Sequence, residues 1–380
     1  MPNFSGIWNL KEQVQAIAAG RWSGLPTLEL YGWGLNSSGQ LGDNTAVDKS
    51  SPVQVGASIN WAQVSAGALH TAAVKTDGTI WSWGNNGSGR LGDGTVVYKS
   101  SPVQIGALTN WSQVSAGSLH TTAVEADGGL YAWGSNLNGE LGDGTVVGKS
   151  SPVQIGALTN WVRVAAGQQH NLAVKTDGTL WAWGANARGQ LGQNNVLLRS
   201  SPVQVGVLTT WSQVSAASSF SAAIKSDNTI WMWGEGTTGQ LGDGTVNRRS
   251  SPVQIGALTN WAQVSAGIAH ASAVKTDGTI WAWGRGLDGQ LGDGTAINKS
   301  SPVQIGALTN WAQVSAGSSH TAAVKTDGTI WSWGNNGSGR LGDGTVVYKS
   351  SPVQIGALTN WSQVSAGSLH TAAILQGTTS

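Results

Sequence analysis

A unit of 50 residues recurs along almost the whole of this 380-residue chain. One element, W-x-x-V-x-A-x-x-x followed by His or Phe, starts at Trp61, Trp111, Trp161, Trp211, Trp261, Trp311 and Trp361. A second, W-G-x-x-x-x-G-x-L-G, starts at Trp33, Trp83, Trp133, Trp183, Trp233, Trp283 and Trp333. Such a period indicates one supersecondary unit stacked on copies of itself. It therefore overrides the two or three domains that the length alone would suggest.

The two ends of the repeat array are complementary halves. The chain opens with the second element and closes with the first, so six whole units stand between two half units. We expect residues 361–376 to supply the two inner strands of a closing sheet. Residues 28–33 and the segment up to residue 56 would then supply its two outer strands.

Each unit has the pattern of about four β-strands. Polar and apolar residues alternate in segment 61–67, and two short apolar segments follow at 70–75 and 79–83. The Asp77-Gly78 pair between these two segments is a signal for a tight hairpin. After a glycine-rich excursion, 101–106 forms a last strand whose Pro102 suits a sheet edge.

The fold class that follows is all-β. A lone four-stranded sheet cannot bury both of its faces, whereas sheets stacked around an axis can. We predict a seven-bladed β-propeller over residues 27–380, closed by the N- and C-terminal halves of one blade and preceded by a tail, residues 1–26. The glycine content and the period-2 pattern exclude a helical solenoid, and an open β-solenoid would need capping units instead of complementary halves.

The repeat resembles that of the RCC1-repeat family. The resemblance rests on V-S-A-G-x-x-H-T-A-A-V at 64–74 and 314–324 and on W-G-x-N-x-x-G-x-L-G at 83–92. It implies a seven-bladed propeller with this mode of closure. Family members include an exchange factor that uses an inserted β-wedge, a plant ultraviolet photoreceptor with Gly-Trp-Arg-His-Thr runs, and a secreted β-lactamase inhibitor. The strict spacing leaves no room for a wedge and such runs are absent, so only an inhibitor-like binding mode stays open.

Composition excludes several functional classes. Twenty Lys and Arg against 19 Asp and Glu give a net charge of +1, without the basic field that nucleic-acid binding requires. The absence of cysteine removes disulfides, thiolate metal sites and cysteine nucleophiles. We expect no membrane span and no Sec signal.

Three recurrent residue types are interpreted as structural, so we predict no enzyme, no cofactor and no metal. Six histidines hold equivalent positions, with Phe220 at the seventh, and we expect each imidazole to satisfy buried backbone groups. The Leu-Gly-Asp-Gly-Thr loops offer one carboxylate each, too few for calcium. Tryptophans such as Trp61, Trp81 and Trp83 are expected to fill the wedges between blades, with a carbohydrate-stacking role as the alternative. No nucleophile, base and orienting acid come together in the sequence.

The units differ mainly in two loops that share one face. With strands A to D counted outward, the A–B and C–D loops emerge on the same side, and both vary between units. We hypothesise that this face recognises a partner, with blades 4 and 5 the most divergent and neutral drift as the alternative. The candidate contact residues are Tyr98, Arg188, Arg199, Phe220, Glu235, Arg248, Arg249, Arg285 and Tyr348.

The non-repeating N-terminus has the pattern of a short helix. Asn9 and Glu12 have capping-box spacing, and Gly20 can end the helix. A helix this short must dock on something, so we assign attachment to an assembly to Trp8, Leu10, Val14 and Ile17. The segment also resembles the openings of tailed-phage virion proteins, in which S-G-x-W-x-L precedes a repetitive domain.

These observations favour a non-enzymatic interaction or structural propeller, part of a larger assembly such as a phage virion. Its partners would be other chains of the assembly at the tail, and a host or partner protein on the variable face. The first alternative is a free-standing bacterial protein that inhibits or regulates a partner, located in the cytoplasm or outside the cell. The second is a lectin that uses exposed rings such as Tyr98 and Tyr348.

Overall fold

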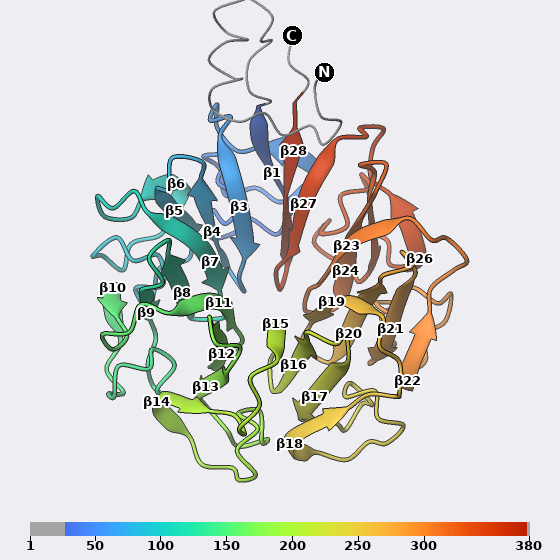
Figure 1. Ribbon diagram of the computed structural model, residues 1–380. Helices are drawn as coiled ribbons and strands as arrows, with labels where there is room; N and C mark the ends of the chain where they lie inside the picture. Colours follow the sequence, from blue (N-terminus) through green and yellow to red (C-terminus); the bar gives the residue numbers. More distant parts are fainter. Residues whose placement is uncertain (1–26, 378–380) are drawn as a thin grey trace, which may run out of the picture.

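The computed structural model describes residues 27–377, which form seven four-stranded antiparallel sheets arranged around a central axis (Figure 1). Strands are the only regular elements in this range, and none of its residues lies in a helix that could cross a membrane. The short helix predicted between Asn9 and Gly20 lies outside the described residues.

The strands fall into four classes from the axis outward. The A strands are β3 (Trp61–Ala66), β7 (Trp111–Ala116), β11 (Trp161–Ala166), β15 (Trp211–Ala216), β19 (Trp261–Ala266), β23 (Trp311–Ala316) and β27 (Trp361–Ala366). The B strands are β4 (His70–Lys75), β8 (His120–Glu125), β12 (His170–Lys175), β16 (Phe220–Lys225), β20 (His270–Lys275), β24 (His320–Lys325) and β28 (His370–Gln376). The C strands are β5 (Ile80–Gly84), β9 (Leu130–Gly134), β13 (Leu180–Gly184), β17 (Ile230–Gly234), β21 (Ile280–Gly284), β25 (Ile330–Gly334) and β1 (Leu28–Gly34). The D strands are β6 (Lys99–Gln104), β10 (Lys149–Gln154), β14 (Arg199–Gln204), β18 (Arg249–Gln254), β22 (Lys299–Gln304), β26 (Lys349–Gln354) and β2 (Lys49–Gln54).

Blade 1 closes the ring as the complementary half units predict. It has the order β2-β1-β28-β27, and blades 2 to 7 follow in chain order from β3–β6 to β23–β26. Strand β1 pairs antiparallel with β28 from Leu28 opposite Gln376 to Gly34 opposite His370. Figure 1 shows β1 and β28 side by side in this sheet. Backbone hydrogen bonds between β1 and β28 therefore join the two halves of the blade.

Tryptophans fill the wedges between blades. Between blades 1 and 2, Trp61 and Trp83 pack edge to face, with ring centroids 5.8 Å apart, in one cluster with Leu30 and Ile374. The prediction that Trp81 also fills a wedge needs correction, because this residue is only half-buried. There Lys75 Nζ lies 4.0 Å from the ring centroid of Trp81, and so covers a ring face that a sugar would need for stacking.

Side chains bridge the A strands around the axis. Gln63 Oε1 accepts a hydrogen bond from Val114 N at 2.8 Å, and Ser65 Oγ accepts one from Ala116 N at 2.9 Å. Equivalent Gln bonds join four other junctions and equivalent Ser bonds five others. These bonds supply acceptors for the free edge of six of the seven inner strands, which have no neighbouring strand on the axis side.

The bridges are missing between blades 4 and 5. Blade 4 has Arg163 and Ala165 in place of Gln and Ser, and neither side chain offers an acceptor to Val214 N or Ala216 N. Val214 is half-buried, whereas its six equivalents are buried. This junction is therefore the most open of the seven at the axis.

Candidate functional site

The variable segments lie together on one end of the propeller. Because neighbouring strands are antiparallel, the A–B loops and the C–D loops emerge on the same side in every blade. We call this side the loop face; in blade 2 it comprises residues 67–69 and 85–98. The B–C turns and D–A connections form the opposite face, where the sequence hardly changes between blades. The pairings thus confirm that the variable stretches share a face.

The central channel opens on the loop face through a narrow mouth. Residues 66–68 and their equivalents in every blade surround a space of about 110 Å³; most of them are Ala, Gly or Ser, with Gln168 and Ile268 as the exceptions. Further in, polar residues such as Gln63 and Ser65 surround about 300 Å³. The side chains that line this channel already bridge neighbouring strands, so we place the candidate site on the loops around the mouth.

The recurrent histidines are buried and structural, but their partners differ from the prediction. Each imidazole Nε2 lies 2.9 Å from a hydroxyl or amide oxygen of the next blade, and not from backbone groups. The pairs are His70–Thr121, His120–Asn171, His170–Ser221, His270–Thr321, His320–Thr371 and His370–Thr71. The partner side chain in turn donates to a loop carbonyl, as Thr121 Oγ1 does to Arg90 O at 2.8 Å. This chain of bonds fixes the C–D loops of six blades against the next blade, and only blade 5 lacks it among the described residues.

Burial keeps these imidazoles neutral. It lowers the pKa of His170 and of His270 to about 3, and that of His370 to about 4, because the charged form loses its hydration. The pKa of His70, His120 and His320 is lowered for the same reason. Neutral, fully buried rings cannot exchange protons with a ligand on the surface.

Phe220 cannot contact a partner, so its assignment as a contact residue was wrong. Its side chain is fully buried at the position of the missing seventh histidine. Two neighbouring positions change with it. Ala217 replaces a glycine, and Ala271 replaces the hydrogen-bonding residue of the next blade. The divergence of Phe220 therefore reflects packing between blades 5 and 6.

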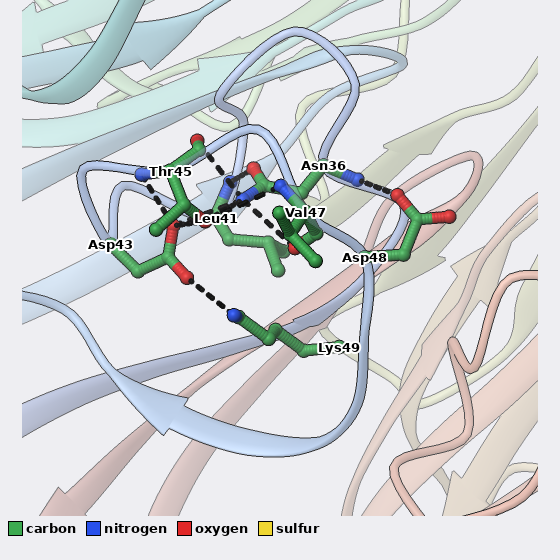
Figure 2. Close-up of polar contacts among 7 residues, drawn as sticks. All are labelled: Asn36, Leu41, Asp43, Thr45, Val47, Asp48 and Lys49. Atoms are coloured by element: carbon green, nitrogen blue, oxygen red, sulfur yellow. Dashed lines mark hydrogen bonds and ion pairs between the residues drawn. The ribbon is translucent and has the colours of Figure 1, made fainter.

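An asparagine organises the C–D loop in five blades. In blade 1, Asn36 Nδ2 donates to Asp43 Oδ1 at 2.9 Å and to Thr45 O at 3.2 Å, while Asn36 Oδ1 accepts from Leu41 N at 3.0 Å (Figure 2). The same clasp recurs at Asn86, Asn136 and Asn336, and at Asn186 with Asn195 as acceptor in place of the aspartate; all four asparagines are buried. This position varies between blades, yet it faces inward and cannot meet a partner. The clasp makes the loop a defined platform for its neighbours.

The loop aspartate is saturated by the same network. Asp43 Oδ1 also accepts from Thr45 N at 3.0 Å and Thr45 Oγ1 at 2.7 Å, and Lys49 Nζ lies 3.6 Å from Asp43 Oδ2 (Figure 2). The hydrogen bonds from Thr45 and Asn36 and the Lys49 charge lower the pKa of Asp43 against the opposing effect of burial. Within residues 27–377, no group of three or more His, Asp or Glu side chains could hold a metal ion. The carboxylate thus stabilises a turn.

Blades 5 and 6 lack this clasp. Glycine stands at the asparagine position, as Gly236 and Gly286. A Cβ placed on Gly236 would lie 2.0 Å from Asn247 O, and one on Gly286 would lie 2.2 Å from Ile297 O. The loop backbone has therefore moved into the space of the missing side chain, and these two platforms differ in shape from the other five.

The charged candidates of blades 4 and 5 form one cluster. Arg188 Nε and Arg248 Nε lie 3.2 Å and 3.1 Å from the same oxygen, Glu235 Oε2. The two arginine side chains are 46% and 48% exposed, whereas that of Glu235 is 13% exposed. The outer surface of the cluster is therefore cationic.

The remaining arginine candidates differ in their partners. Arg249 pairs with Asp243 at 2.7 Å, and Arg285 pairs with Asp288 within its own loop. Arg199 forms no ion pair among the described residues, because Gln193 replaces the aspartate that other blades have. The structure thus brings together Arg188, Glu235 and Arg248. Arg285 lies in the C–D loop of blade 6, whereas Arg199 and Arg249 are the first residues of β14 and β18.

Apolar side chains also reach solvent on the C–D loops. Tyr98 and Tyr348 are about half exposed, as expected. Each loop adds exposed aliphatic residues, among them Val47, Val97, Val147, Leu197, Val246, Ile297 and Val347. Exposed aliphatic residues also recur on the opposite face, as Leu108, Leu208 and Leu308, so apolar exposure alone does not distinguish the two faces.

Two residues of this face were missed by the sequence reasoning. Arg90 and Arg340 are almost completely buried beneath the C–D loops of blades 2 and 7. The position holds Gln or Glu in the other five blades, and this internal difference was the signal available. The attachment candidates Trp8, Leu10, Val14 and Ile17 lie outside the described residues.

Comparison with known proteins agrees with this architecture. The family described as RCC1-like domain matches residues 29–373. Prp20p from Saccharomyces cerevisiae, whose structure was reported with its binding properties to Gsp1p and histones, is similar with a TM-score of 0.84 and 22% identity over 93% of each chain. Human WBSCR16 is similar with a TM-score of 0.84 and 22% identity, over 92% of this chain and 99% of that one. No curated protein sequence gives a significant match. At these identities the structural similarity establishes the fold alone.

Proposed function

The chain belongs to the RCC1-like domain family, and from this premise we propose that it is a non-enzymatic interaction module whose loop face binds a partner protein. One observation carries the proposal. The loop face changes from blade to blade, on C–D loops that carry the asparagine clasp in five of the seven blades, while the opposite face repeats with little change. Differences confined to one end of a rigid ring give that end a chemical identity that a partner can recognise.

The character of the loop face supports binding to a protein. It combines half-exposed tyrosines, aliphatic loop tips and arginines whose carboxylate partners lie deeper. Aromatic residues and arginine are enriched in protein interfaces and contribute most of their binding energy. An interaction of this kind requires no cofactor.

Exchange of the variable loops tests the proposal. Residues 185–198 and 235–248 are replaced by the sequence of 335–348, which removes the Arg188–Glu235–Arg248 cluster and preserves the loop length. The matched control makes the same exchange at 135–148 of blade 3. We expect the exchange in blades 4 and 5 to abolish co-purification of the native partner, and the control exchange to retain it. Unchanged co-purification in both variants would contradict the proposal.

We further propose that residues 1–26 attach the propeller to a larger assembly, such as a phage particle, and hence that it resides in the virion. The support is the similarity of this segment to the openings of virion proteins and its lack of any counterpart in the repeats. Deletion of residues 1–26 should remove the protein from the assembly without unfolding the propeller. If the truncated protein still assembles, the free-standing binder is the better description.

A further inference from the structure

In five blades, a side-chain oxygen occupies a fixed place inside the C–D loop. Gln40 Oε1 accepts a hydrogen bond from Ser38 N at 2.9 Å, two residues earlier in the chain. Glu140, Gln190, Gln240 and Gln290 make the equivalent bond at 2.8–2.9 Å. The N–H two residues before this position is thus normally satisfied by a carboxamide or carboxylate oxygen.

Blades 2 and 7 replace this acceptor with a donor. Arginine stands at the position, as Arg90 and Arg340, and a guanidinium cannot accept a hydrogen bond. Within residues 27–377, no oxygen accepts from the N–H of Ser88 or of Ser338. Each loop therefore combines a free backbone N–H with a cation where the other blades have an oxygen.

The arginine itself is incompletely paired. Arg90 is 4% exposed; its Nη1 donates to Ser118 O at 3.1 Å, and its Nη2 lies 3.5 Å from Ser88 Oγ. Arg90 Nε is buried and donates to no acceptor among the described residues. Burial lowers the pKa of Arg90, but a guanidinium keeps its charge in proteins.

Blade 7 repeats this arrangement. Arg340 is 6% exposed, its Nη1 lies 3.3 Å from Ser368 O, and its Nε has no acceptor among the described residues. Neither arginine forms an ion pair within residues 27–377. Burial lowers the pKa of Arg340 and the charge of Asp288 opposes this shift, but the ion pair of Asp288 is with Arg285. A buried charge without a counter-ion is costly, so both loops are suited to gain an anion.

We propose that Ser88 and Arg90 in blade 2, and Ser338 and Arg340 in blade 7, form two oxyanion-binding sites on the loop face. One oxygen of the anion replaces the absent glutamine oxygen and accepts from the serine N–H and hydroxyl. The guanidinium supplies the positive charge. The half-exposed Ser88 and Ser338 give access, and the hydroxyls of Tyr98 and Tyr348 lie beside Gly87 and Gly337 at the rim.

The ligand is a carboxylate on an acidic side chain of the partner protein. The two sites lie in the blades on either side of blade 1, so one acidic surface can engage both. This source of the oxyanion rests on the proposed function, whereas the sites themselves do not. A free inorganic oxyanion shares the same chemistry, and the experiment separates the two sources.

The experiment compares the full-length protein with an R90Q/R340Q variant. Glutamine occupies this position in four other blades, so the fold accepts it and its oxygen fills the site. The matched control is K99Q/K349Q, which removes two cations of the same blades from outside the proposed sites. Both variants and the parent are titrated at constant ionic strength with sodium sulfate, with a hexaglutamate peptide and with a hexaglutamine peptide. Backbone amide shifts of Ser88 and Ser338 are followed by NMR, together with the midpoint of thermal unfolding.

We expect saturable shifts of both serine amides and a rise in the unfolding midpoint with hexaglutamate, in the parent and in K99Q/K349Q but not in R90Q/R340Q. Hexaglutamine should have no effect. Saturation by sulfate alone would overturn the assignment to a partner carboxylate and retain the oxyanion site. Absence of saturable shifts, or equal effects on R90Q/R340Q, would overturn the site itself. These titrations use no native partner, so their results do not depend on whether the proposed function is correct.

Discussion

Phe220 in blade 5 and Ala271 in blade 6 occupy the places that hold a histidine and its hydrogen-bonding partner at every other junction of the ring. Both lie in one apolar cluster, so the polar pair has been replaced on both sides at once. Replacing both members of a buried hydrogen bond can be nearly neutral, whereas replacing one leaves an unsatisfied group. Ala217 belongs to the same set of linked substitutions. At its equivalent, Gly67, a Cβ would lie 2.6 Å from His70 Cε1.

This relationship predicts strong coupling among the three residues. F220H alone should lower the free energy of unfolding by about 1–3 kcal/mol, because the imidazole would have no acceptor and would contact the Ala217 methyl group. The triple variant A217G/F220H/A271T should recover most of that loss. Urea denaturation of the single and triple variants measures the coupling. A triple variant no more stable than F220H would show that the positions are independent.

The buried histidines predict sensitivity to mild acid. Their folded pKa values lie below the unfolded value of about 6.5, so the unfolded chain binds more protons as the pH falls beneath that value. Stability is therefore fully present above pH 6.5 and decreases towards pH 4, by up to about 1.4 kcal/mol per pH unit for each histidine. The free energy of unfolding between pH 7 and pH 4 measures this dependence.

A control for the acid effect copies the natural junction of blades 5 and 6. The variant G267A/H270F/T321A removes one buried imidazole together with its partner. Its stability should depend less steeply on pH over the same range, by the contribution of one histidine. An unchanged slope would assign the acid sensitivity to other groups.

The asparagine clasp predicts opposite roles for Asn and Gly at one loop position. N86A should destabilise the protein by about 1–3 kcal/mol and speed amide exchange in residues 87–95, because Leu91 N loses its buried acceptor. G236N should also destabilise it, since a Cβ there meets Asn247 O. Hydrogen exchange followed by mass spectrometry reports both effects. Added protection in the loop of G236N would show that a clasp can form there.

The open junction between blades 4 and 5 predicts a stabilising repair. R163Q/A165S restores the two acceptors that join inner strands elsewhere, so the amides of Val214 and Ala216 should exchange more slowly and stability should rise by about 1 kcal/mol. The reverse change at an intact junction, Q313R/S315A, should weaken protection of Val364 and Ala366. Equal exchange in the parent and the repaired protein would mean that the bridges do not control the junction.

The repeat period in the sequence is sufficient to predict most of the architecture. Seven copies of each element and complementary ends predicted the number of blades and the pairing of β1 with β28, because local strand and turn signals recur at fixed spacing. Antiparallel order then placed the variable loops on one face. This part of the fold depends on periodicity and chain direction, both of which are properties of the sequence.

Contacts between blades could not be predicted in this way. The bond from His70 to Thr121 and that from Gln63 to Val114 join residues 51 positions apart, and only the packing of neighbouring blades decides which atoms meet. Phe220 therefore resembled a divergent surface residue although it is buried. Arg90 was not predicted because its role depends on a side-chain oxygen of Gln or Glu that five other blades have at this position and blade 2 lacks.

Two exposed residues of blade 4 test whether the loop face of the ring binds the partner. Leu198 ends the C–D loop, and Leu208 lies in the D–A connection on the opposite face; both are about half exposed. Each is replaced in turn by the photo-crosslinker p-benzoylphenylalanine, and the protein is irradiated in its native assembly. We expect a discrete cross-linked partner from position 198, which disappears when the rest of the loops of blades 4 and 5 is exchanged and the cross-linker is kept at 198, and none from position 208. A partner cross-linked from position 208 alone would contradict this prediction.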